Sequence, residues 1–306
     1  MCFMNSVSII TVNFNQPKAT IELLLSLNKS YKDEIEIILV DNASNVNHEA
    51  DFKKIIPNLV FIRSESNLGF AGGNNLGIKA AKGNFIFLLN NDTEVPAGCL
   101  ETMVAEFEAQ PNIGLLSPLI IYDDDKSMIQ YAGYTPLNYL TARNSQIGQF
   151  EKNKGQYDGL SYETGFCHGA AVMCRREDLL KAGLMEENYF LYYEELDWCE
   201  KFKRLGKTIN FTGKTFIYHK ESISVGKESD IKTYFLTRNR MLFIRKNTGL
   251  LNTIFFSLYY TLVACPKMIF TYAKNGRTDL IKWVFKALIW NFTHNKNSKS
   301  LGFKIN

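Results

Sequence analysis

The chain has 306 residues, of which 46% are hydrophobic and 22% are charged, which suits one large or two medium domains and excludes a disordered chain. It has no heptad run and no long repeat, which excludes coiled coils and solenoids. Its six cysteines include no C-x-x-C pair, which excludes a zinc knuckle, so we expect reduced, buried thiols in a cytosolic protein. Residues 231–306 carry thirteen lysines and arginines and one acid, a net +12, whereas the remaining 22 basic and 30 acidic side chains give residues 1–230 a net −8.

The first 120 residues alternate between strand and helix patterns. The N-terminus lacks a basic segment followed by a long apolar run, so we expect no secretory signal. Continuous apolar strands separated by helices predict a mostly parallel α/β sheet of the doubly wound, Rossmann-like class, which binds ligands at the carboxyl ends of its strands. Strands are predicted at 6–14, 35–40, 59–63, 84–89 and 113–117, and helices at 17–28, 47–56, 73–81 and 97–110.

The second half begins with a polar, irregular stretch at 122–165, which is typical of a functional segment. A strand at 170–174 and a helix opening near Glu177 follow, then a helix at 194–205 and strands at 208–211 and 215–219. From residue 231 the pattern is helical, which predicts a domain over 1–230 and a helical C-terminal region over 231–306.

Two apolar segments of this region, 250–273 and 280–292, contain lysines, namely Lys267 in the first and Lys282 and Lys286 in the second, and Pro266 interrupts the first. Trp and Phe beside basic residues are typical of helices that lie in a membrane interface, which we favour over a spanning helix. The alternative is a helical subdomain packed on the core or on a second copy in a homodimer.

Polar residues follow the first three strands. Asn13 ends the first, and Asp41 and Asn42 end the second. Asp41 either caps a helix or accepts hydrogen bonds from a nucleotide base. The Gly-rich segment NLGFAGGNN, which contains Gly72 and Asn74, allows close approach of backbone or ligand, and a helix from Gly73 would present free N–H groups to an anion.

Carboxylates mark two further places. Asn90 and Asp92 follow the fourth strand and offer the hard oxygens that Mg²⁺ or Mn²⁺ prefers, although an Asx cap would use the same residues. The second place is a cluster of carboxylates among aromatic residues, formed by Glu194, Glu195 and Asp197. Burial would raise the pKa of one of these carboxyls and so produce a general base. The alternative is an acidic first turn of a helix. His219 ends a predicted strand and by itself indicates a core or edge histidine.

Taken in order, the segments VDNAS, NLGFAGGNN, LLNND, GAA, YYEELDW and a late histidine resemble family 2 glycosyltransferases of the GT-A fold, particularly bacterial rhamnosyltransferase-like and galactofuranosyltransferase-like members. The resemblance covers residues 6–249. It implies nucleotide-binding roles for Asn13, Asp41, Asn42, Gly72 and Asn74, metal binding by Asp92, Asn90 and His219, and acceptor contacts at His168 and Gly169. Glu194 and Glu195 fall on the family's acidic pair, whose second member is the base, so we favour Glu195 and keep Asp197 as the alternative.

The resemblance further implies a metal-dependent, inverting transfer from a UDP or dTDP sugar to a glycan or lipid-linked acceptor of bacterial surface polysaccharide synthesis. The basic helices would hold such an enzyme on the inner face of the plasma membrane. A nucleotidyltransferase is the first alternative, but it needs a basic Gly-rich loop after the first strand, where this chain has NFNQPK. A nucleic-acid or scaffold protein is the second, and the continuous apolar runs of the tail disfavour a nucleic-acid groove.

Overall fold

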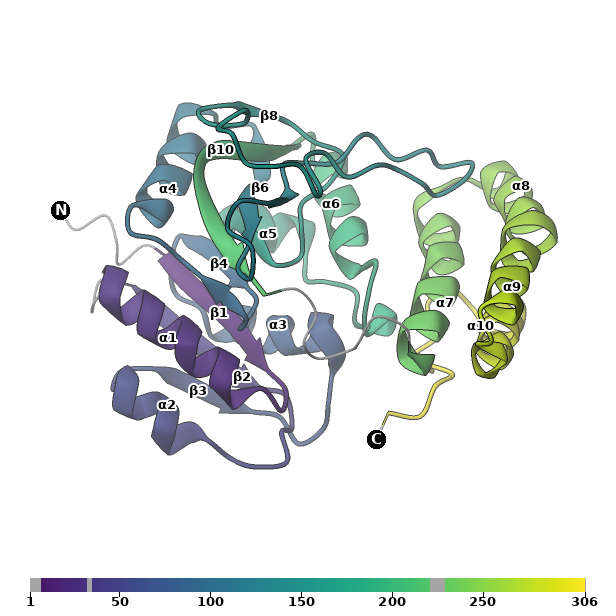
Figure 1. Ribbon diagram of the computed structural model, residues 1–306, viewed down its shortest axis with the longest axis horizontal. Helices are drawn as coiled ribbons and strands as arrows, with labels where there is room; N and C mark the ends of the chain where they lie inside the picture. The colour runs from purple at the N-terminus through teal and green to yellow at the C-terminus, as the bar shows by residue number, and fades with distance from the viewer. Residues whose placement is uncertain (1–6, 32–34, 221–228, 306) are drawn as a thin grey trace.

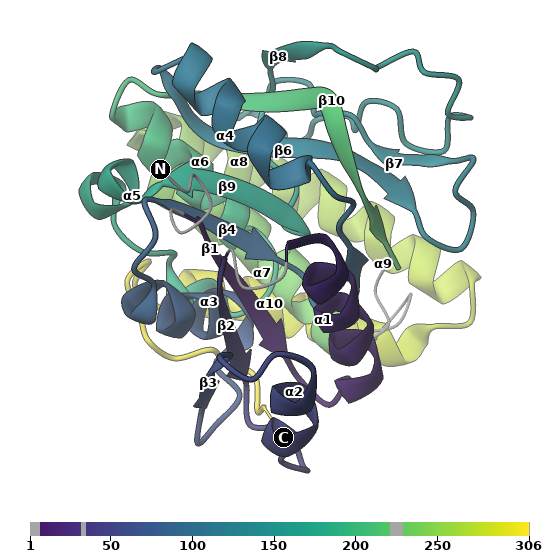
Figure 2. The same ribbon diagram turned by 90° about the vertical axis from the view of Figure 1, so that its left-hand side faces the viewer.

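A computed structural model describes residues 7–31, 35–220 and 229–305, so Ser6 and Cys2 lie outside the described residues. One mixed sheet has the strand order β3-β2-β1-β4-β9-β6-β10-β5, with β7 paired to β6 and β8 to β10. Figure 2 shows this order from β3 upward to β10. The strands are β1 (Val7–Asn13), β2 (Glu36–Asp41), β3 (Val60–Arg63), β4 (Phe85–Leu89), β5 (Thr93–Glu94), β6 (Ile113–Tyr122), β7 (Ile129–Tyr131), β8 (Ser161–Glu163), β9 (Ala171–Arg175) and β10 (Thr208–His219).

Helices cover both faces of the sheet, because successive side chains of each buried strand point to opposite sides. Ile9 of β1 belongs to one core with α1, α2 and α4, and its neighbour Ile10 belongs to the other core with α3, α5 and α6. Figure 1 shows these two layers of helices. The helices are α1 (Pro17–Tyr31), α2 (Glu49–Ile55), α3 (Gly69–Ala80), α4 (Cys99–Ala109), α5 (Arg176–Ala182) and α6 (Glu194–Arg204).

The predicted α/β fold is confirmed, with three local differences, the first of which is that the short strands β5, β7 and β8 were not predicted. β9 runs antiparallel between β4 and β6, so the parallel arrangement is interrupted in the middle of the sheet. The two strands predicted at 208–211 and 215–219 are one strand, β10, whose pairing with β6 shifts register between Thr212 and Phe216. A β-bulge places extra residues opposite one partner and breaks the alternating pattern, which made one strand resemble two.

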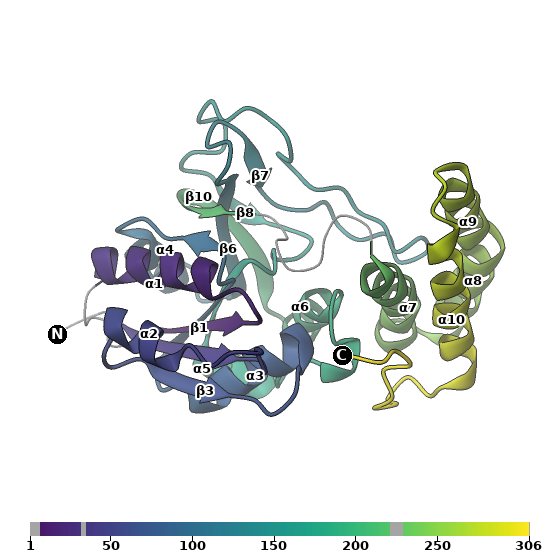
Figure 3. The same cartoon turned by 60° about the horizontal axis from the view of Figure 1, so that its bottom comes forward.

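The C-terminal region is helical, as predicted. It consists of α7 (Asp230–Asn247), α8 (Leu250–Tyr259), a π-helical turn (Tyr260–Ala264), α9 (Cys265–Lys274), a short 3-10 turn (Thr278–Leu280) and α10 (Ile281–Thr293). Figures 1 and 3 show α7 beside α6, with α8, α9 and α10 on the outer side of α7.

Pro266 does not interrupt the apolar segment, contrary to the prediction from sequence. The helix continues from Leu250 to Lys274. Cys265 donates its N–H to the carbonyl of Tyr260, five residues earlier, and this wider turn admits a proline that has no N–H to donate. The five described cysteines are buried, as predicted, and none of them is paired in a disulfide.

Candidate active site

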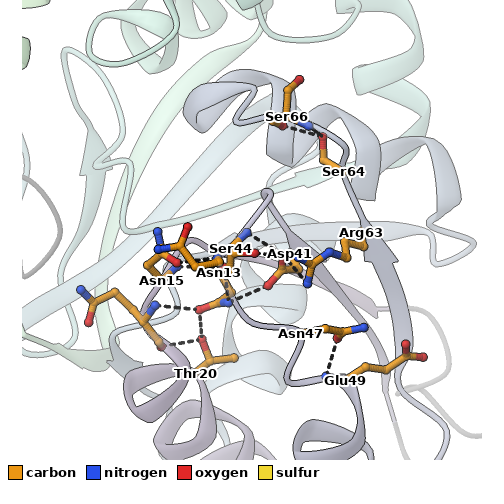
Figure 4. A network of polar contacts seen from close by, with 12 residues as sticks. Asn13, Asn15, Thr20, Asp41, Ser44, Asn47, Glu49, Arg63, Ser64 and Ser66 are labelled. Atoms are coloured by element: carbon orange, nitrogen blue, oxygen red, sulfur yellow. Dashed lines mark hydrogen bonds and ion pairs between the residues drawn. The ribbon is translucent and has the colours of Figure 1, made fainter. Parts of the chain in front are cut away.

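The carboxyl ends of β1 and β2 join in a buried polar network, drawn in Figure 4. Asp41 is fully buried, and its two oxygens accept from Asn13 Nδ2 at 3.0 Å and from the N–H of Ser44 at 2.9 Å. Arg63, at the end of β3, lies 3.6 Å from Asp41 and donates to the carbonyl of Ser44 at 2.6 Å. Because parallel strands end at one edge of the sheet, residues separated by up to 50 positions meet here.

The network continues toward the candidate metal residues. Asn13 Oδ1 accepts from Thr20 Oγ1 at 3.0 Å, and Thr20 Oγ1 accepts from Asn91 Nδ2 at 2.9 Å. Asn91 lies between Asn90 and Asp92 in the loop after β4. A hydrogen-bond path therefore connects the predicted base-binding residues with the predicted metal-binding loop.

The Gly-rich segment packs closely against the sheet and is joined to Asn42. Asn42 donates to the carbonyl of Gly69 at 3.0 Å and accepts from the N–H of Leu68 at 2.9 Å. The helix α3 begins at Gly69, so the prediction of a free helix N-terminus at Gly73 was wrong. Gly73 lies in the second turn, where an added Cβ would approach Val12 to 2.8 Å, so this glycine serves close helix–sheet packing.

Two other predicted nucleotide-binding residues also serve α3. Gly72 leaves no room for a side chain, because a Cβ there would lie 2.6 Å from Cβ of Leu68. Asn74 is buried and donates to the carbonyl of Phe70 at 2.9 Å. Neither residue takes part in the network of Figure 4, so any contact of these two with a nucleotide stays a prediction.

The predicted metal residues meet at the other end of the loop. β5 pairs with the end of β10, with Thr93 opposite His219, and this pairing puts His219 Nε2 3.2 Å from Asp92 Oδ1. Asn90 Nδ2 lies 3.4 Å from the same nitrogen. On the far side of the ring, His219 Nδ1 lies 2.8 Å from Gln130 Oε1 and donates to it, which leaves the lone pair of Nε2 facing Asp92.

This arrangement fits a divalent cation. A carboxylate oxygen and an imidazole lone pair repel each other at 3.2 Å unless a proton or a cation lies between them. Burial raises the pKa of Asp92, but when Nε2 carries a proton the hydrogen bond and charge of His219 outweigh burial and hold the pKa of this carboxyl below its ordinary value. A divalent cation would take the place of that proton. Among the described residues no group of three or more His, Cys, Asp or Glu side chains is arranged to hold a metal ion by itself. Mg²⁺ commonly takes only one or two carboxylates and completes its shell with phosphate oxygens.

The segment before β9 joins the metal pair to the acidic pair. The rings of His168 and His219 lie 5.9 Å apart, and burial beside His219 lowers the pKa of His168 to about 3, so His168 is neutral. Next to it, a Cβ on Gly169 would lie 4.0 Å from Cγ of Glu195 and 3.8 Å from the ring of Phe70. These two predicted acceptor-binding residues therefore lie between Glu195 and the Asp92–His219 pair.

Glu194 and Glu195 begin α6 and differ from the other acids of the site. Glu194 is buried with Oε2 lacking a hydrogen-bond partner among the described residues, and desolvation and its neighbour raise its pKa well above the ordinary range. Burial raises the pKa of Glu195 to about 7. A carboxyl with a pKa near neutrality is suited to general base catalysis.

Asp197 has a different environment. It is buried and accepts at Oδ1 from Tyr189 Oη at 3.1 Å and from Asn247 Nδ2 of α7 at 2.7 Å. Residues two positions apart on a helix face different directions. Between the two candidate bases of the sequence analysis, the geometry favours Glu195.

The sequence analysis missed four residues that support the site: Thr20, Ser44, Arg63 and Gln130. Arg63 is the last residue of the predicted strand 59–63, and Ser44 lies in the loop that follows the predicted strand 35–40, so polar residues could have been considered at both places. Gln130 lies in the irregular stretch at 122–165 and had no such signal.

Comparison with known proteins identifies the class. The sequence profile described as "Glycosyl transferase family 2" matches residues 8–182, more than half of the chain. The chain belongs to this family and is a glycosyltransferase, which transfers a sugar from a nucleotide sugar; the prediction from the ordered motifs is confirmed.

Characterised relatives are distant. The chain is 24% identical to the "Low-salt glycan biosynthesis hexosyltransferase Agl10" of Haloferax volcanii, over 78% of this chain and 75% of the relative. It is 20% identical to the "N-acetylglucosaminyl-diphospho-decaprenol L-rhamnosyltransferase" of Mycobacterium tuberculosis, over 72% and 78%.

Solved structures confirm the GT-A fold. GalNAc-T7 in complex with UDP, GalNAc and Mn²⁺ matches with a TM-score of 0.67 at 16% identity, covering 95% of this chain and 56% of that one. The mannosyltransferase PcManGT of Pyrobaculum calidifontis with GDP-Man and Mn²⁺ matches at 0.57 and 12% identity, covering 94% and 87%.

Proposed function

We propose that this glycosyltransferase transfers a sugar, with inversion, from a UDP or dTDP sugar to a hydroxyl of a glycan or lipid-linked acceptor in surface polysaccharide synthesis. The convergence of Glu195 with Asp92 and His219 around the 168–169 segment carries the proposal. The name of the mycobacterial relative specifies a lipid-linked acceptor, and one S. aureus TarS structure contains UDP-GlcNAc, which support the choice of partners.

In the proposed reaction Glu195 removes the proton of the acceptor hydroxyl, whose oxygen attacks C1 of the donor sugar. The bond from C1 to the phosphate oxygen breaks, and the nucleoside diphosphate leaves with that electron pair. A divalent Mg²⁺ or Mn²⁺ held by Asp92, His219 and Asn90 would offset negative charge on the diphosphate. The Asp41 network would fix the loop after β2, which would contact the base of the donor nucleotide.

The test is release of nucleoside diphosphate from a panel of nucleotide sugars, with Mn²⁺ and with excess chelator. We expect release that chelation abolishes and that Asp92→Asn lowers at least a hundredfold. Asp124→Asn, an exposed acid of the loop after β6, is the matched control and should leave release unchanged. Pyrophosphate release from a nucleoside triphosphate, without release from nucleotide sugars, would establish the nucleotidyltransferase alternative instead.

We further propose that α8, α9 and α10 dock on an anionic membrane surface. Eleven of the eighteen exposed large hydrophobic side chains in the described part of the chain lie between residues 250 and 292, and patches of this size mark interaction sites. They are Leu250, Leu251, Ile254, Phe255, Leu258, Leu262, Val263, Phe270, Phe285, Ile289 and Phe292. Lys282 and Lys286 lie over the ring of Trp283 and add positive charge beside this surface.

The packing favours lying on the membrane over crossing it. The helix from Leu250 to Lys274 is long and apolar enough to span, by length and composition. However, Phe256, Tyr260 and Cys265 on its inner side are buried against the α7–α10 core. One face is thus committed to the protein, which leaves the opposite face for lipid.

Vesicle flotation tests this proposal with Phe255→Ser combined with Leu258→Ser. We expect the wild-type protein to bind vesicles containing anionic lipid, and the double variant to bind at least tenfold more weakly. Leu180→Ser, an equally exposed leucine on α5, is the control and should bind normally. Unchanged vesicle binding by the double variant would refute membrane docking, and loss of a dimer in light scattering would establish the homodimer alternative.

A further inference from the structure

We infer that Arg238 and Asn239 of α7 are positioning residues that hold the turn carrying Glu195, an inference that rests on the proposed role of Glu195 as the base. The turn comprises residues 188–193 and leads directly into α6. It is connected to α7 by hydrogen bonds between groups separated by about 50 positions in the chain.

The turn has an unfavourable backbone conformation. Phe190, Tyr192 and Tyr193 have φ angles of 66°, 71° and 76°. Bulky residues rarely adopt positive φ, and such a conformation persists only where the surrounding structure enforces it. The residues immediately before Glu194 and Glu195 therefore need external support to keep this shape.

Asn239 supplies much of this support. It is fully buried, and its Nδ2 lies within hydrogen-bond distance of three turn carbonyls: Tyr189 at 3.0 Å, Leu191 at 2.8 Å and Tyr192 at 2.8 Å. Its Oδ1 accepts from Arg238 Nε at 2.8 Å, which fixes the amide so that the nitrogen faces the turn.

Arg238 holds the start of the same turn. Its guanidinium is fully buried and donates to the carbonyls of Asn188 and Tyr189, and on its other side to the carbonyl of Leu301 at 2.7 Å. It also stacks over the ring of Trp290, 4.7 Å from the centroid. The C-terminal segment thus takes part in holding the turn, and a deletion of 250–306 would disturb the site as well as membrane binding.

The turn also contacts the Gly-rich segment. The carbonyl of Phe190 accepts from the N–H of Phe70 at 2.8 Å, and a Cβ on Gly69 would lie 2.1 Å from that carbonyl oxygen. A displacement of the turn would therefore move the acidic pair and the start of α3 together.

Several charged and titratable groups surround Glu195, and the pKa of Glu195 reports whether it keeps its place among them. They are Glu194 on the same helix, Tyr192 and Tyr193 in the turn, and Tyr134 from the irregular stretch. Arg240 of α7 donates to Tyr193 Oη at 2.7 Å, and Arg238 is the cation that acts on Glu194. A loosened turn would admit water to Glu195 and lower its pKa toward the ordinary value.

The experiment compares Asn239→Ala with Asn291→Ala. Asn291 is a buried asparagine of α10 that donates to two carbonyls, of Arg238 and Ala287, and makes none of the turn contacts. For Asn239→Ala we expect faster amide hydrogen exchange in peptides covering 188–195. We also expect kcat to fall at least tenfold, with the KM for the donor within twofold of wild type. The acidic limb of the kcat–pH profile should move to lower pH by at least half a pH unit. Asn291→Ala should retain the wild-type limb.

Each outcome is decisive. The positioning role would be overturned if Asn239→Ala exchanged faster at 188–195 but kept the wild-type kcat and the wild-type acidic limb of the kcat–pH profile. It would also be overturned if Asn239→Ala and Asn291→Ala lost kcat equally. If Asn239→Ala does not fold, Asn239→Ser, which offers a hydroxyl as hydrogen-bond donor in place of the amide, is measured in the same way and judged by the same criteria. Failure of the wild-type protein to turn over any nucleotide sugar would refute the proposed function. Unchanged amide exchange at 188–195 in an active Asn239→Ala variant would refute only the positioning role of Arg238 and Asn239.

Discussion

Two buried acidic regions of this glycosyltransferase are built in opposite ways. At the end of β2, Asp41 is surrounded by donors from Asn13, Ser44 and Arg63. At the start of α6, Glu194 has an oxygen without a hydrogen-bond partner among the described residues, and burial raises the pKa of Glu195 to about 7.

The difference separates structural from chemical roles. A buried carboxylate whose oxygens accept hydrogen bonds from several donors holds neighbouring segments in place. Buried carboxyls with too few donors oppose folding and persist where reactivity requires them. The comparison therefore supports a structural role for Asp41 and the proposed proton transfer by the acidic pair. The following substitutions test this contrast.

Glu195→Gln should have the largest effect. The amide cannot accept the acceptor's proton, so we expect kcat to fall about 10²–10⁴-fold, the usual contribution of a general base. Steady-state transfer assays measure this effect, with binding of nucleoside diphosphate expected to stay within twofold. Glu200→Gln, on the same helix and paired with Lys203, is the control. A loss of less than fivefold would remove Glu195 from the reaction.

Asn13→Ala should break the other region through stability. It removes the donor to Asp41 Oδ2 and the acceptor of Thr20 Oγ1, both buried. We expect the free energy of unfolding to fall by about 2–3 kcal/mol, because buried polar groups are left unpaired. Urea denaturation measures it, with the exposed Asn45→Ala as control. A change below about 0.5 kcal/mol would mean that the network contributes little to folding.

The smallest effect is a pH-dependent stabilisation by Glu195→Gln. The pKa of Glu195 is raised in the folded state, so its contribution to stability is complete below the unfolded value near 4.5 and is lost as the pH rises through about 7. The variant should therefore be more stable than wild type at pH 8, by about 1–3 kcal/mol, with the advantage declining toward pH 4. Thermal unfolding at both pH values measures the effect, and a pH-independent difference would contradict it.

Much of the fold and part of the site could be predicted from the sequence. Strand and helix periodicity located the longer strands of the sheet but not the short strands β5, β7 and β8. The ordered motifs gave the family and the pairing of Asp92 with His219. Register shifts inside β10 and the start of α3 at Gly69 could not be predicted, because bulges and tight helix–sheet packing depend on partners distant in sequence.

The C-terminal region shows where sequence reasoning reaches its limit. Local composition determined that residues 231–306 are helical, basic and rich in aromatic side chains, because these properties follow from the residues themselves. Tertiary packing alone decided whether each basic side chain of this region faces solvent. Arg238 counts toward the basic tail but is fully buried against the turn at 188–193. Arg240 also counts toward it but donates to Tyr193. Hydrogen bonds between groups about 50 positions apart leave no periodic signal, so the support of Glu195 by α7 emerges only once the chain has folded.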